Sequence, residues 1–206
     1  MITVLMATYQ GRQYLEQQLD TILAQTVPVK ILISDDGSDD GTREMLDNYA
    51  GWYPEQVVLH HRTEHTGGAA GNFFWLMQEA LKDEKNEYIL FSDQDDVWEN
   101  DKVSVMLHRM KVLEKGLGSA CPILLYSDME VVDEELYEIS PSFASYTHQD
   151  PDRSSFAELL VENQVTGGAS MINRALLMRC AKAPEVCCMH DWWIALTASC
   201  FGIIEF

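Results

Sequence analysis

Short apolar segments alternate four times with segments whose apolar residues recur at helical spacing. The apolar segments are typical of buried strands, which we predict at residues 2–6, 31–33, 57–59 and 88–91. After each of them the spacing predicts a helix, over residues 15–24, 45–49, 73–81 and 103–113. This alternation predicts an α/β fold: a Rossmann-like, mostly parallel sheet with helices on both faces. Ligands of such a sheet bind outside the carboxyl ends of its strands.

The remainder of the chain is less regular. A strand over residues 123–126 is expected to continue to residue 133 as a long strand or a hairpin, and residues 140–155 are polar and loop-like. Later elements are predicted as a short helix at 156–161, a glycine-led strand at 166–173, a helix opening at 189–196 and a strand at 202–206. Because this last strand simply stops, we expect the natural chain to continue past Phe206.

Asp93, Asp95 and Asp96 crowd into four positions directly after the fourth predicted strand. Like charges at that spacing repel each other and resist desolvation, so a cation is expected nearby. The chain, with a net charge of −19, has few cations to spare. Mg²⁺ or Mn²⁺ is therefore the expected partner, since both take hard oxygen ligands from carboxylates and substrate phosphates. The alternative is an acidic turn in which Asp95 or Asp96 caps the following helix, and the motif alone leaves both interpretations open.

The composition of the 206 residues argues against some classes of partner. The strong negative charge argues against a nucleic-acid backbone or an anionic lipid surface as the main partner. Five cysteines without a C-x-x-C pair or zinc spacing indicate reduced thiols of a cytosolic protein. There is neither a basic leader nor an apolar run of about 20 residues, so we expect no secretory signal and no transmembrane segment. A cytoplasmic protein is predicted, and peripheral association with the inner face of a membrane stays open.

Two common phosphate-binding motifs are absent from the sequence. The first predicted strand is not followed by G-x-G-x-x-G, and G-x-x-x-x-G-K-[ST] does not occur. The dinucleotide-binding and P-loop classes are therefore excluded, although base contacts at one loop and a metal at another could still hold a nucleotide. A nucleotidyltransferase is a weaker alternative, because residues 7–12 match poorly the Gly-rich, Lys/Arg-bearing loop that such enzymes carry.

Taken in order, six segments of the chain resemble the family 2 inverting glycosyltransferases, which have the GT-A fold. The segments are residues 6–11, 34–42, 67–72, 91–98, 163–168 and 190–193. The order of the six segments is what indicates the family, since the motif Asp-x-Asp alone is not specific to it. The forms Ser-Asp-Gln-Asp-Asp-Val-Trp and His-Asp-Trp-Trp look most like the rhamnosyltransferase-type branch, which builds bacterial surface polysaccharides.

This resemblance implies a nucleotide site built from the N-terminal loops. Thr8 and Tyr9 would line the nucleobase pocket. Asp36 would accept a hydrogen bond from N3–H of uracil or thymine, a task that suits an acceptor-only carboxylate. The alternative for Asp36 is an ordinary turn residue. Asp93 would face the ribose or the sugar of the donor.

The resemblance also implies where the metal, the sugar and the base lie. Asp95, with Asp96, would hold Mn²⁺ or Mg²⁺ on the diphosphate. Gly167 and Gly168 would border the donor sugar, where glycine allows close backbone approach, and a tight turn is the alternative. Asp191 would be the catalytic base, or else the N-cap of the helix that follows it, and these two roles are compatible.

The implied reaction transfers a sugar, rhamnose in this branch, from a UDP- or dTDP-linked donor to a glycan or lipid-linked acceptor with inversion. We expect a single glycosyltransferase domain over residues 1–206. Residues 1–98 would form its nucleotide-binding half and residues 99–206 its donor-sugar and acceptor half. The other function left open is a non-catalytic nucleotide-sugar binding module, which would keep Asp36 and Asp95 but would not need Asp191.

Overall fold

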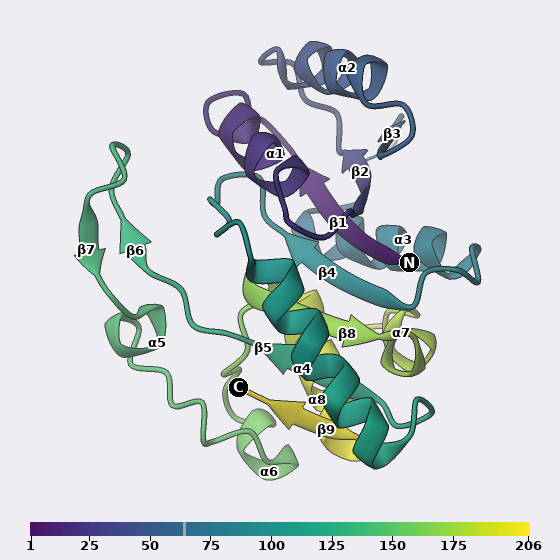
Figure 1. Ribbon diagram of the computed structural model, residues 1–206, viewed down its shortest axis with the longest axis vertical. Helices are drawn as coiled ribbons and strands as arrows, with labels where there is room; N and C mark the ends of the chain where they lie inside the picture. Colours follow the sequence, from purple (N-terminus) through teal and green to yellow (C-terminus); the bar gives the residue numbers. More distant parts are fainter. Residues whose placement is uncertain (64) are drawn as a thin grey trace.

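A seven-stranded sheet forms the centre of the molecule, with the strand order β3-β2-β1-β4-β8-β5-β9 (Figure 1). The computed structural model describes residues 1–63 and 65–206. In chain order, the strands of this sheet are β1 (Ile2–Thr8), β2 (Lys30–Asp35), β3 (Val57–His61), β4 (Tyr88–Ser92), β5 (Ile123–Tyr126), β8 (Ser170–Asn173) and β9 (Ile203–Glu205). The four strands predicted for the first half of the chain are therefore all present.

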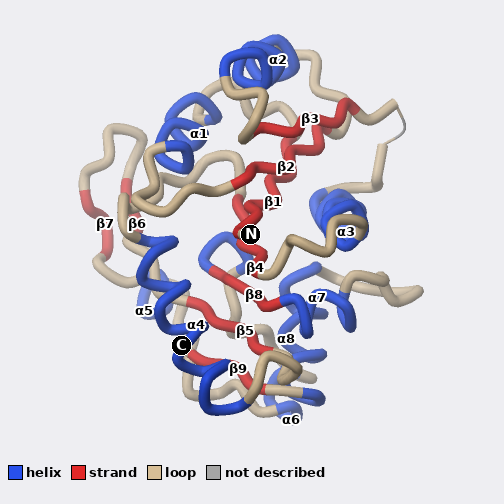
Figure 2. The backbone as a smooth tube through the Cα atoms, turned by 45° about the vertical axis from the view of Figure 1, so that its right-hand side comes forward, coloured by secondary structure: helices blue, strands red, loops and turns tan. Residues whose placement is uncertain are grey.

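Helices cover both faces of this sheet (Figure 2). The longer ones are α1 (Leu15–Leu23), α2 (Thr42–Trp52), α3 (Ala69–Leu81), α4 (Lys102–Leu117), α7 (Arg174–Cys180) and α8 (His190–Phe201). Side chains of α1, α2 and α4 pack with Val4 and Met6 of β1 in one core, whereas α3, α7 and α8 pack with Leu5 in the other. Because successive strand residues point to opposite faces, β1 contributes to both cores. The predicted coverage of both faces is confirmed.

The carboxyl ends of the N-terminal strands meet at one edge of the sheet. β1 pairs in parallel with β2 and with β4, so that Ala7 lies opposite Ser34 and Met6 lies opposite Ser92. The loops that leave β1, β2 and β4 therefore start side by side. This is the edge at which a parallel α/β sheet binds its ligands.

β8 brings a later part of the chain to the same edge. It runs antiparallel to both β4 and β5, with Ser170 opposite Tyr126 near the carboxyl end of β5. A single 3₁₀ turn, η1 (Gly167–Ala169), immediately precedes β8. Because β8 is reversed, its first residues lie where the parallel strands end, and η1 is placed beside the loop that follows β4. The predicted glycine-led strand is thus a glycine turn followed by a shorter strand.

Several elements of the second half differ from the prediction. β5 ends at Tyr126, and the chain leaves the main sheet for a separate two-stranded hairpin of β6 (Val131–Val132) and β7 (Glu138–Ser140). One turn of helix, α5 (Phe143–Tyr146), interrupts the expected loop, and α6 (Phe156–Leu159) is shorter than predicted. α7 was not predicted, because it follows β8 without a loop: Asn173 ends the strand, and its side chain accepts a hydrogen bond from Leu176 N–H as the helix cap.

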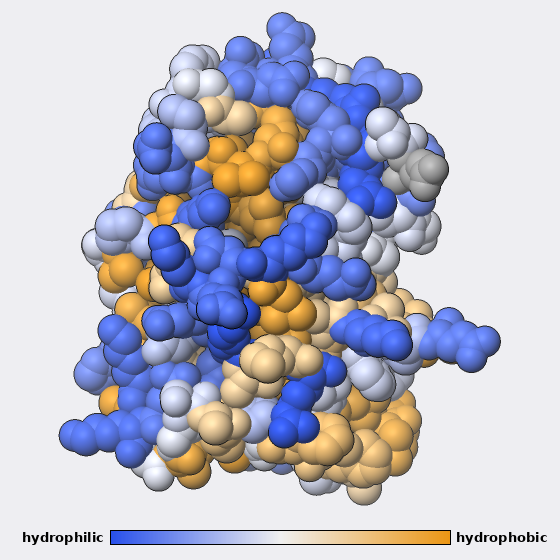
Figure 3. Space-filling model, turned by 90° about the vertical axis from the view of Figure 1, so that its right-hand side faces the viewer, coloured by the Kyte–Doolittle hydropathy of each residue, from blue (hydrophilic) through white to orange (hydrophobic). Residues whose placement is uncertain are grey.

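The surface is mixed in character. On the face shown in Figure 3, one hydrophobic patch lies near the upper centre and a larger hydrophobic area lies at the lower right, with hydrophilic residues around and between them. The second half of the chain has several exposed apolar side chains, including those of Val161, Met178, Val186 and Phe201. No helix within residues 1–63 and 65–206 combines the length and the apolar character needed to cross a membrane.

Candidate functional site

A cavity of about 690 Å³ opens at the carboxyl ends of the N-terminal strands, a volume in the range of small-molecule sites. Five of the residues predicted for nucleotide and metal binding line it: Thr8, Tyr9, Asp36, Asp93 and Asp95. Its wall also includes residues from the loop after β3 and the first turns of α3: His65, Gly67, Gly68, Ala69, Asn72 and Phe73. The structure therefore brings the two acidic loops to a common cavity.

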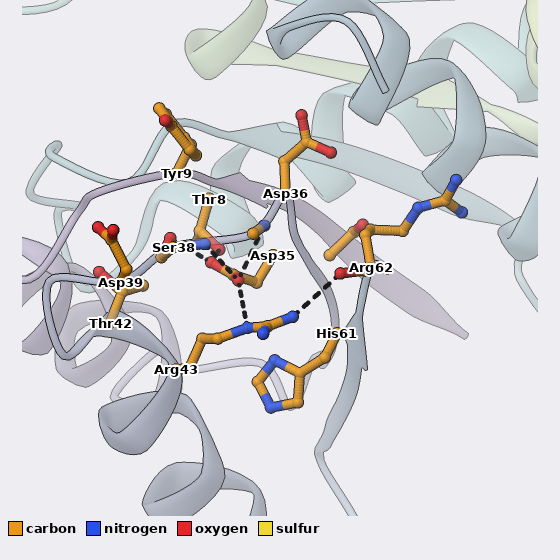
Figure 4. A network of polar contacts seen from close by, with 12 residues as sticks. Thr8, Tyr9, Asp35, Asp36, Ser38, Asp39, Thr42, Arg43, His61 and Arg62 are labelled. Atoms are coloured by element: carbon orange, nitrogen blue, oxygen red, sulfur yellow. Dashed lines mark hydrogen bonds and ion pairs between the residues drawn. The ribbon is translucent and has the colours of Figure 1, made fainter. Parts of the chain in front are cut away.

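Asp35, which the sequence did not single out, organises the loop after β2 (Figure 4). Its fully buried carboxylate accepts hydrogen bonds from Ser38 N–H at 3.0 Å and from the Ser38 hydroxyl at 2.5 Å. Arg43 pairs with the same carboxylate at 3.0 Å and donates to the Arg62 carbonyl at 3.0 Å. The network folds the loop back on itself. In Figure 4, Asp36 points away from this network, on the same side as Tyr9.

The side chain of Asp36 is bound to the loop after β3. Thr66 donates to it twice, from its backbone N–H at 2.8 Å and from its hydroxyl at 3.0 Å. His65 lies 4.0 Å from the same carboxylate and meets the Tyr9 ring edge to face, with centroids 6.2 Å apart. Asp36 thus holds two loops together at the cavity, which goes beyond an ordinary turn role. Thr8 is buried, and its hydroxyl already donates to Asp35 at 3.2 Å.

The acidic loop after β4 lies at the other side of the cavity. Asp93 is accessible from the cavity, but the surrounding protein desolvates its carboxyl and raises its pKa to about 7. The charges of Asp96, Asp95 and Asp191 act in the same direction, in that order. Desolvation also raises the pKa of Asp96. Asp191, far away in the sequence, therefore belongs to the same electrostatic cluster as the acidic loop.

Gly168 lies where these carboxylates converge. A Cβ atom at this position would be 2.8 Å from Asp96 Oδ2 and 2.9 Å from Asp93 Oδ2. At Gly167, a Cβ would lie 3.0 Å from His190 Nε2 and 3.4 Å from the Asp191 Cβ. Close approach, rather than a tight turn with positive φ, is what requires glycine at Gly168.

A lysine places a positive charge next to the carboxylates of the acidic loop. Lys102 Nζ donates to the Gly168 carbonyl at 2.9 Å and lies 4.0 Å from the centroid of the Trp98 ring. Desolvation lowers the pKa of Lys102 to about 8, with the charges of Asp96 and Asp93 opposing that shift. The sequence interpretation considered a metal and overlooked this residue. Lys102 could have been found as the first basic side chain after the acids.

The start of the helix after the acidic loop shows whether Asp95 or Asp96 is its cap. α4 begins at Lys102, and its N-cap residue is Asp101. Neither Asp95 nor Asp96 therefore caps this helix, so that interpretation was wrong. Five residues separate Asp95 from the cap residue Asp101, and the chain between them runs as loop and turn. Asp95 is exposed at the cavity.

Asp191 lies in the first turn of α8, with Met189 as the N-cap residue. The alternative in which Asp191 is itself the N-cap was therefore wrong. Asp191 Oδ2 accepts from Gly167 N–H at 3.2 Å, and Oδ1 accepts from Trp192 N–H at 2.6 Å. Desolvation raises its pKa, and these backbone hydrogen bonds oppose that shift. An ionised carboxylate held in this way has lone pairs left for a further partner.

His190 precedes Asp191 and is buried beneath the site. Its ring stacks on Phe73 with centroids 4.0 Å apart and lies 5.5 Å from the Phe91 ring. Neither ring nitrogen has a hydrogen-bond partner among the described residues. Burial lowers the His190 pKa to about 3, so the imidazole is neutral near pH 7.

The acidic loop is compatible with a divalent metal. Among the residues that the structure describes, no group of three or more His, Cys, Asp or Glu side chains has the arrangement of a metal site. Mg²⁺ and Mn²⁺, however, are commonly held by one or two carboxylates together with substrate phosphates. Desolvation is the main cause of the raised pKa of Asp93, and the charges of Asp96 and Asp95 add to it, so negative charge is concentrated in this loop. The donor set of Asp95 and Asp96 therefore fits such an ion.

Known proteins share this sequence pattern and architecture. The chain is 27% identical over 197 residues to the dTDP-rhamnosyl transferase RfbG of Shigella flexneri, covering 92% of this chain and 63% of RfbG. It is 31% identical over 177 residues to the putative teichuronic acid biosynthesis glycosyltransferase TuaG of Bacillus subtilis, covering 84% of this chain and 66% of TuaG. The chain thus spans slightly less than two thirds of the length of either relative.

A solved structure shares the fold of this chain. The mannosyltransferase PcManGT from Pyrobaculum calidifontis, solved with GDP-Man and Mn²⁺, superposes with a TM-score of 0.68 at 19% identity. The match covers 98% of this chain and 53% of PcManGT, and the expected GT-A fold is confirmed. The model of the family described as "Glycosyl transferase family 2" matches residues 3–180. On this match, and with these relatives, the chain belongs to glycosyl transferase family 2.

Proposed function

We propose that this protein is an inverting glycosyltransferase that uses a nucleoside diphosphate sugar as its donor. The observation that carries the proposal is the meeting of Asp93, from the loop after β4, with Asp191, from α8, at the Gly167–Gly168 segment beside the cavity. A nucleotide-binding module would need the cavity but not a carboxylate from α8. The family match favours glycosyl transfer over nucleotidyl transfer.

In the proposed complex the nucleobase lies between Tyr9 and the loop after β3. Tyr9 is 53% exposed, which leaves its ring free to stack on a base. The Asp36 carboxylate uses one lone pair on each oxygen for Thr66, and the remaining lone pairs can accept N3–H of uracil or thymine. Thr8 would shape the pocket wall through its backbone and methyl group, since its hydroxyl is engaged by Asp35.

The diphosphate would then lie over the acidic loop. Asp95 and Asp96 would hold Mn²⁺ or Mg²⁺ there, and the bound ion would neutralise charge on the leaving diphosphate. Asp93 would face the ribose or the sugar. Gly167 and Gly168 would border the sugar, where the absence of side chains permits close approach.

Asp191 is proposed as the general base. Its Oδ2 is oriented by Gly167 N–H, next to the backbone that would border the sugar. In the reaction, an acceptor hydroxyl gives its proton to Asp191 while its oxygen bonds to the anomeric carbon. The bond from that carbon to the diphosphate breaks on the opposite face, and the anomeric configuration inverts. Desolvation of Asp191 favours proton uptake, as its raised pKa indicates.

The donor is proposed to be dTDP- or UDP-linked, with rhamnose as the first candidate sugar, because RfbG is a dTDP-rhamnosyl transferase. The acceptor is proposed to be a glycan or a lipid-linked glycan in the synthesis of a bacterial surface polysaccharide. TuaG, by its name, acts in teichuronic acid synthesis. A lipid-linked acceptor would bring a cytoplasmic protein to the inner face of the membrane.

A thermal-shift screen tests the donor proposal. Nucleotide sugars with different bases and sugars are each added with Mn²⁺ or with EDTA, and the melting temperature is recorded. A ligand at about 100 times its Kd should stabilise the fold by about 2.7 kcal/mol. We expect a dTDP- or UDP-sugar to raise the melting temperature only with Mn²⁺. If none of these sugars shifts the melting temperature, the donor proposal fails.

A further inference from the structure

Lys102 connects two segments that are far apart in the sequence. It is the first residue of α4, yet its ammonium reaches back to the ring of Trp98 and across to the carbonyl of Gly168, at 4.0 and 2.9 Å. Trp98 is 3% exposed and packed in the core, so it offers a fixed surface. Cations are attracted to the face of an aromatic ring. The position of the ammonium is therefore set by one partner in each half of the chain.

The Gly167–Gly168 segment has three sets of neighbours: a lysine, the carboxylates of the acidic loop, and the first turn of α8. The Gly168 carbonyl accepts from Lys102, and its α-carbon faces the carboxylates of Asp93 and Asp96. The Gly167 N–H donates to Asp191 at 3.2 Å. One short backbone segment thus contacts both Lys102 and the proposed base. A shift of this segment would move Asp191 relative to the acidic loop.

We propose that Lys102 is a positioning residue for sugar transfer: its ammonium fixes the Gly167–Gly168 segment, and through it Asp191, against the acidic loop. The inference rests on the glycosyltransferase function proposed above. Lys102 need not touch the donor or the acceptor in this role. It acts through Gly168, and it also adds a fixed positive charge next to the residues that would bind a metal.

These two properties lead to opposite effects when the ammonium is removed. Four carboxylates, Asp93, Asp95, Asp96 and Asp191, form one electrostatic cluster, and Lys102 is the cation that acts on its members Asp93 and Asp96. A fixed positive charge repels a divalent ion, so its loss should strengthen metal binding. Loss of the contact to Gly168 should at the same time loosen the segment that holds Asp191 and slow the reaction.

The test compares the variants Lys102→Met, Lys102→Gln and Lys102→Arg, each made in the full chain, with the unmodified protein. Mn²⁺ binding without nucleotide is measured by electron paramagnetic resonance, and turnover is measured with the donor found in the thermal-shift screen. We expect Lys102→Met and Lys102→Gln to bind Mn²⁺ about 3- to 30-fold more tightly. Their kcat should fall about 10- to 100-fold with little change in the KM for the donor. Lys102→Arg keeps the charge and should retain the Mn²⁺ affinity of the unmodified protein.

A matched control uses Lys111→Met, which removes a charge from the exposed side of the same helix. This variant should behave like the unmodified protein in both measurements. A purely structural role for Lys102 would weaken Mn²⁺ binding or leave it unchanged as the fold loosens. The proposal is overturned if a neutral variant with an unchanged melting temperature has unchanged or weaker Mn²⁺ affinity, or unchanged kcat.

Failure of this inference can be told apart from failure of the proposed function. If no nucleotide sugar binds, the glycosyltransferase proposal is lost before Lys102 is tested. If a donor binds and is turned over, but neutral Lys102 variants behave like Lys111→Met, only the positioning role is lost. If Lys102→Met does not fold, Lys102→Gln decides the outcome, because its amide removes the same charge and its side chain ends one atom short of the Nζ position that contacts the Gly168 carbonyl.

Discussion

Thr66 holds the Asp36 carboxylate through two hydrogen bonds, from its backbone N–H to Oδ1 at 2.8 Å and from its hydroxyl to Oδ2 at 3.0 Å. These contacts fix the carboxylate in the wall of the cavity. They also determine what a substitution does, because an amide in place of the carboxylate has one oxygen only. Binding of a nucleobase at the proposed site would therefore depend on the charge of Asp36 as well as on its shape.

The Asp36→Asn variant should bind UDP or dTDP roughly 10- to 100-fold more weakly, since a hydrogen bond to a charged group contributes about 1.5–3 kcal/mol. Titration calorimetry with Mn²⁺ present measures the change. Asp39→Asn is the control, because Asp39 is exposed on the same loop and its carboxylate contacts only the Gln10 amide among the described side chains. Equal affinity for both variants would remove Asp36 from nucleobase recognition.

Removal of the metal should weaken nucleotide binding. With EDTA in place of Mn²⁺, we expect the affinity for dTDP or UDP to fall by at least about tenfold, since the diphosphate would face uncompensated carboxylates. Asp95→Asn should reduce the Mn²⁺-dependent part of the affinity. Asp101→Asn should not, because Asp101 makes no capping hydrogen bond and lies outside the cavity. Calorimetry that gives one affinity with and without Mn²⁺ would refute a metal-dependent mechanism.

The Asp191→Asn variant separates binding from chemistry. It preserves size and can still accept from Gly167 N–H, but it cannot take a proton from the acceptor. We expect nucleotide affinity within about twofold of the unmodified protein and turnover reduced by a factor of about 10²–10⁴. Asp152→Asn, at an exposed position, serves as the control. Near-normal turnover by Asp191→Asn would show that another group is the base.

His190 predicts how stability changes with pH. Its pKa is about 3 in the folded protein and near 6.5 when unfolded, so between these values only the unfolded state binds the proton. Stability should therefore rise with pH across this window, by about 1.4 kcal/mol per pH unit from this residue.

His190→Phe keeps the stacking on Phe73 but removes the titrating group. Urea unfolding at about pH 5 and about pH 7 should show a stability difference about 2 kcal/mol smaller in His190→Phe than in the unmodified protein. The carboxylates titrate alike in both proteins, so their contribution to the pH dependence of stability cancels in the comparison. The same pH dependence in both proteins would contradict a buried, neutral His190.

Periodicity alone was enough to predict the first half of the fold. Each strand from β1 to β4 is a short apolar run, and each following helix has a continuous apolar face, so that no long-range information was needed. The strand ends then placed Asp36 and Asp93 at one edge of the sheet. β5 and β6 were harder to separate, because the break between them depends on which strand finds a partner in the main sheet.

The contacts that complete the site could not be predicted in the same way. Thr66 and Lys102 are ordinary residues in their local sequence, and each acquires its role from a partner in another segment: Asp36 for Thr66 and Gly168 for Lys102. Asp35 and Asp36 are also indistinguishable as neighbours in the sequence. The structure separates them, because Arg43 draws one carboxylate into the protein and leaves the other at the cavity.

The reversed direction of β8 has a consequence for how the protein folds. β8 is inserted between β4 and β5, and Arg174, the residue that follows it, donates to the Asn86 carbonyl, 88 residues away. Contacts of such long range form slowly, because a long loop must close first. We therefore expect the proposed catalytic arrangement of Asp93 and Asp191 to assemble after β1–β4 have paired. Residues 1–98 alone would lack it, and a donor that spans both halves would favour the completed sheet over partly folded states.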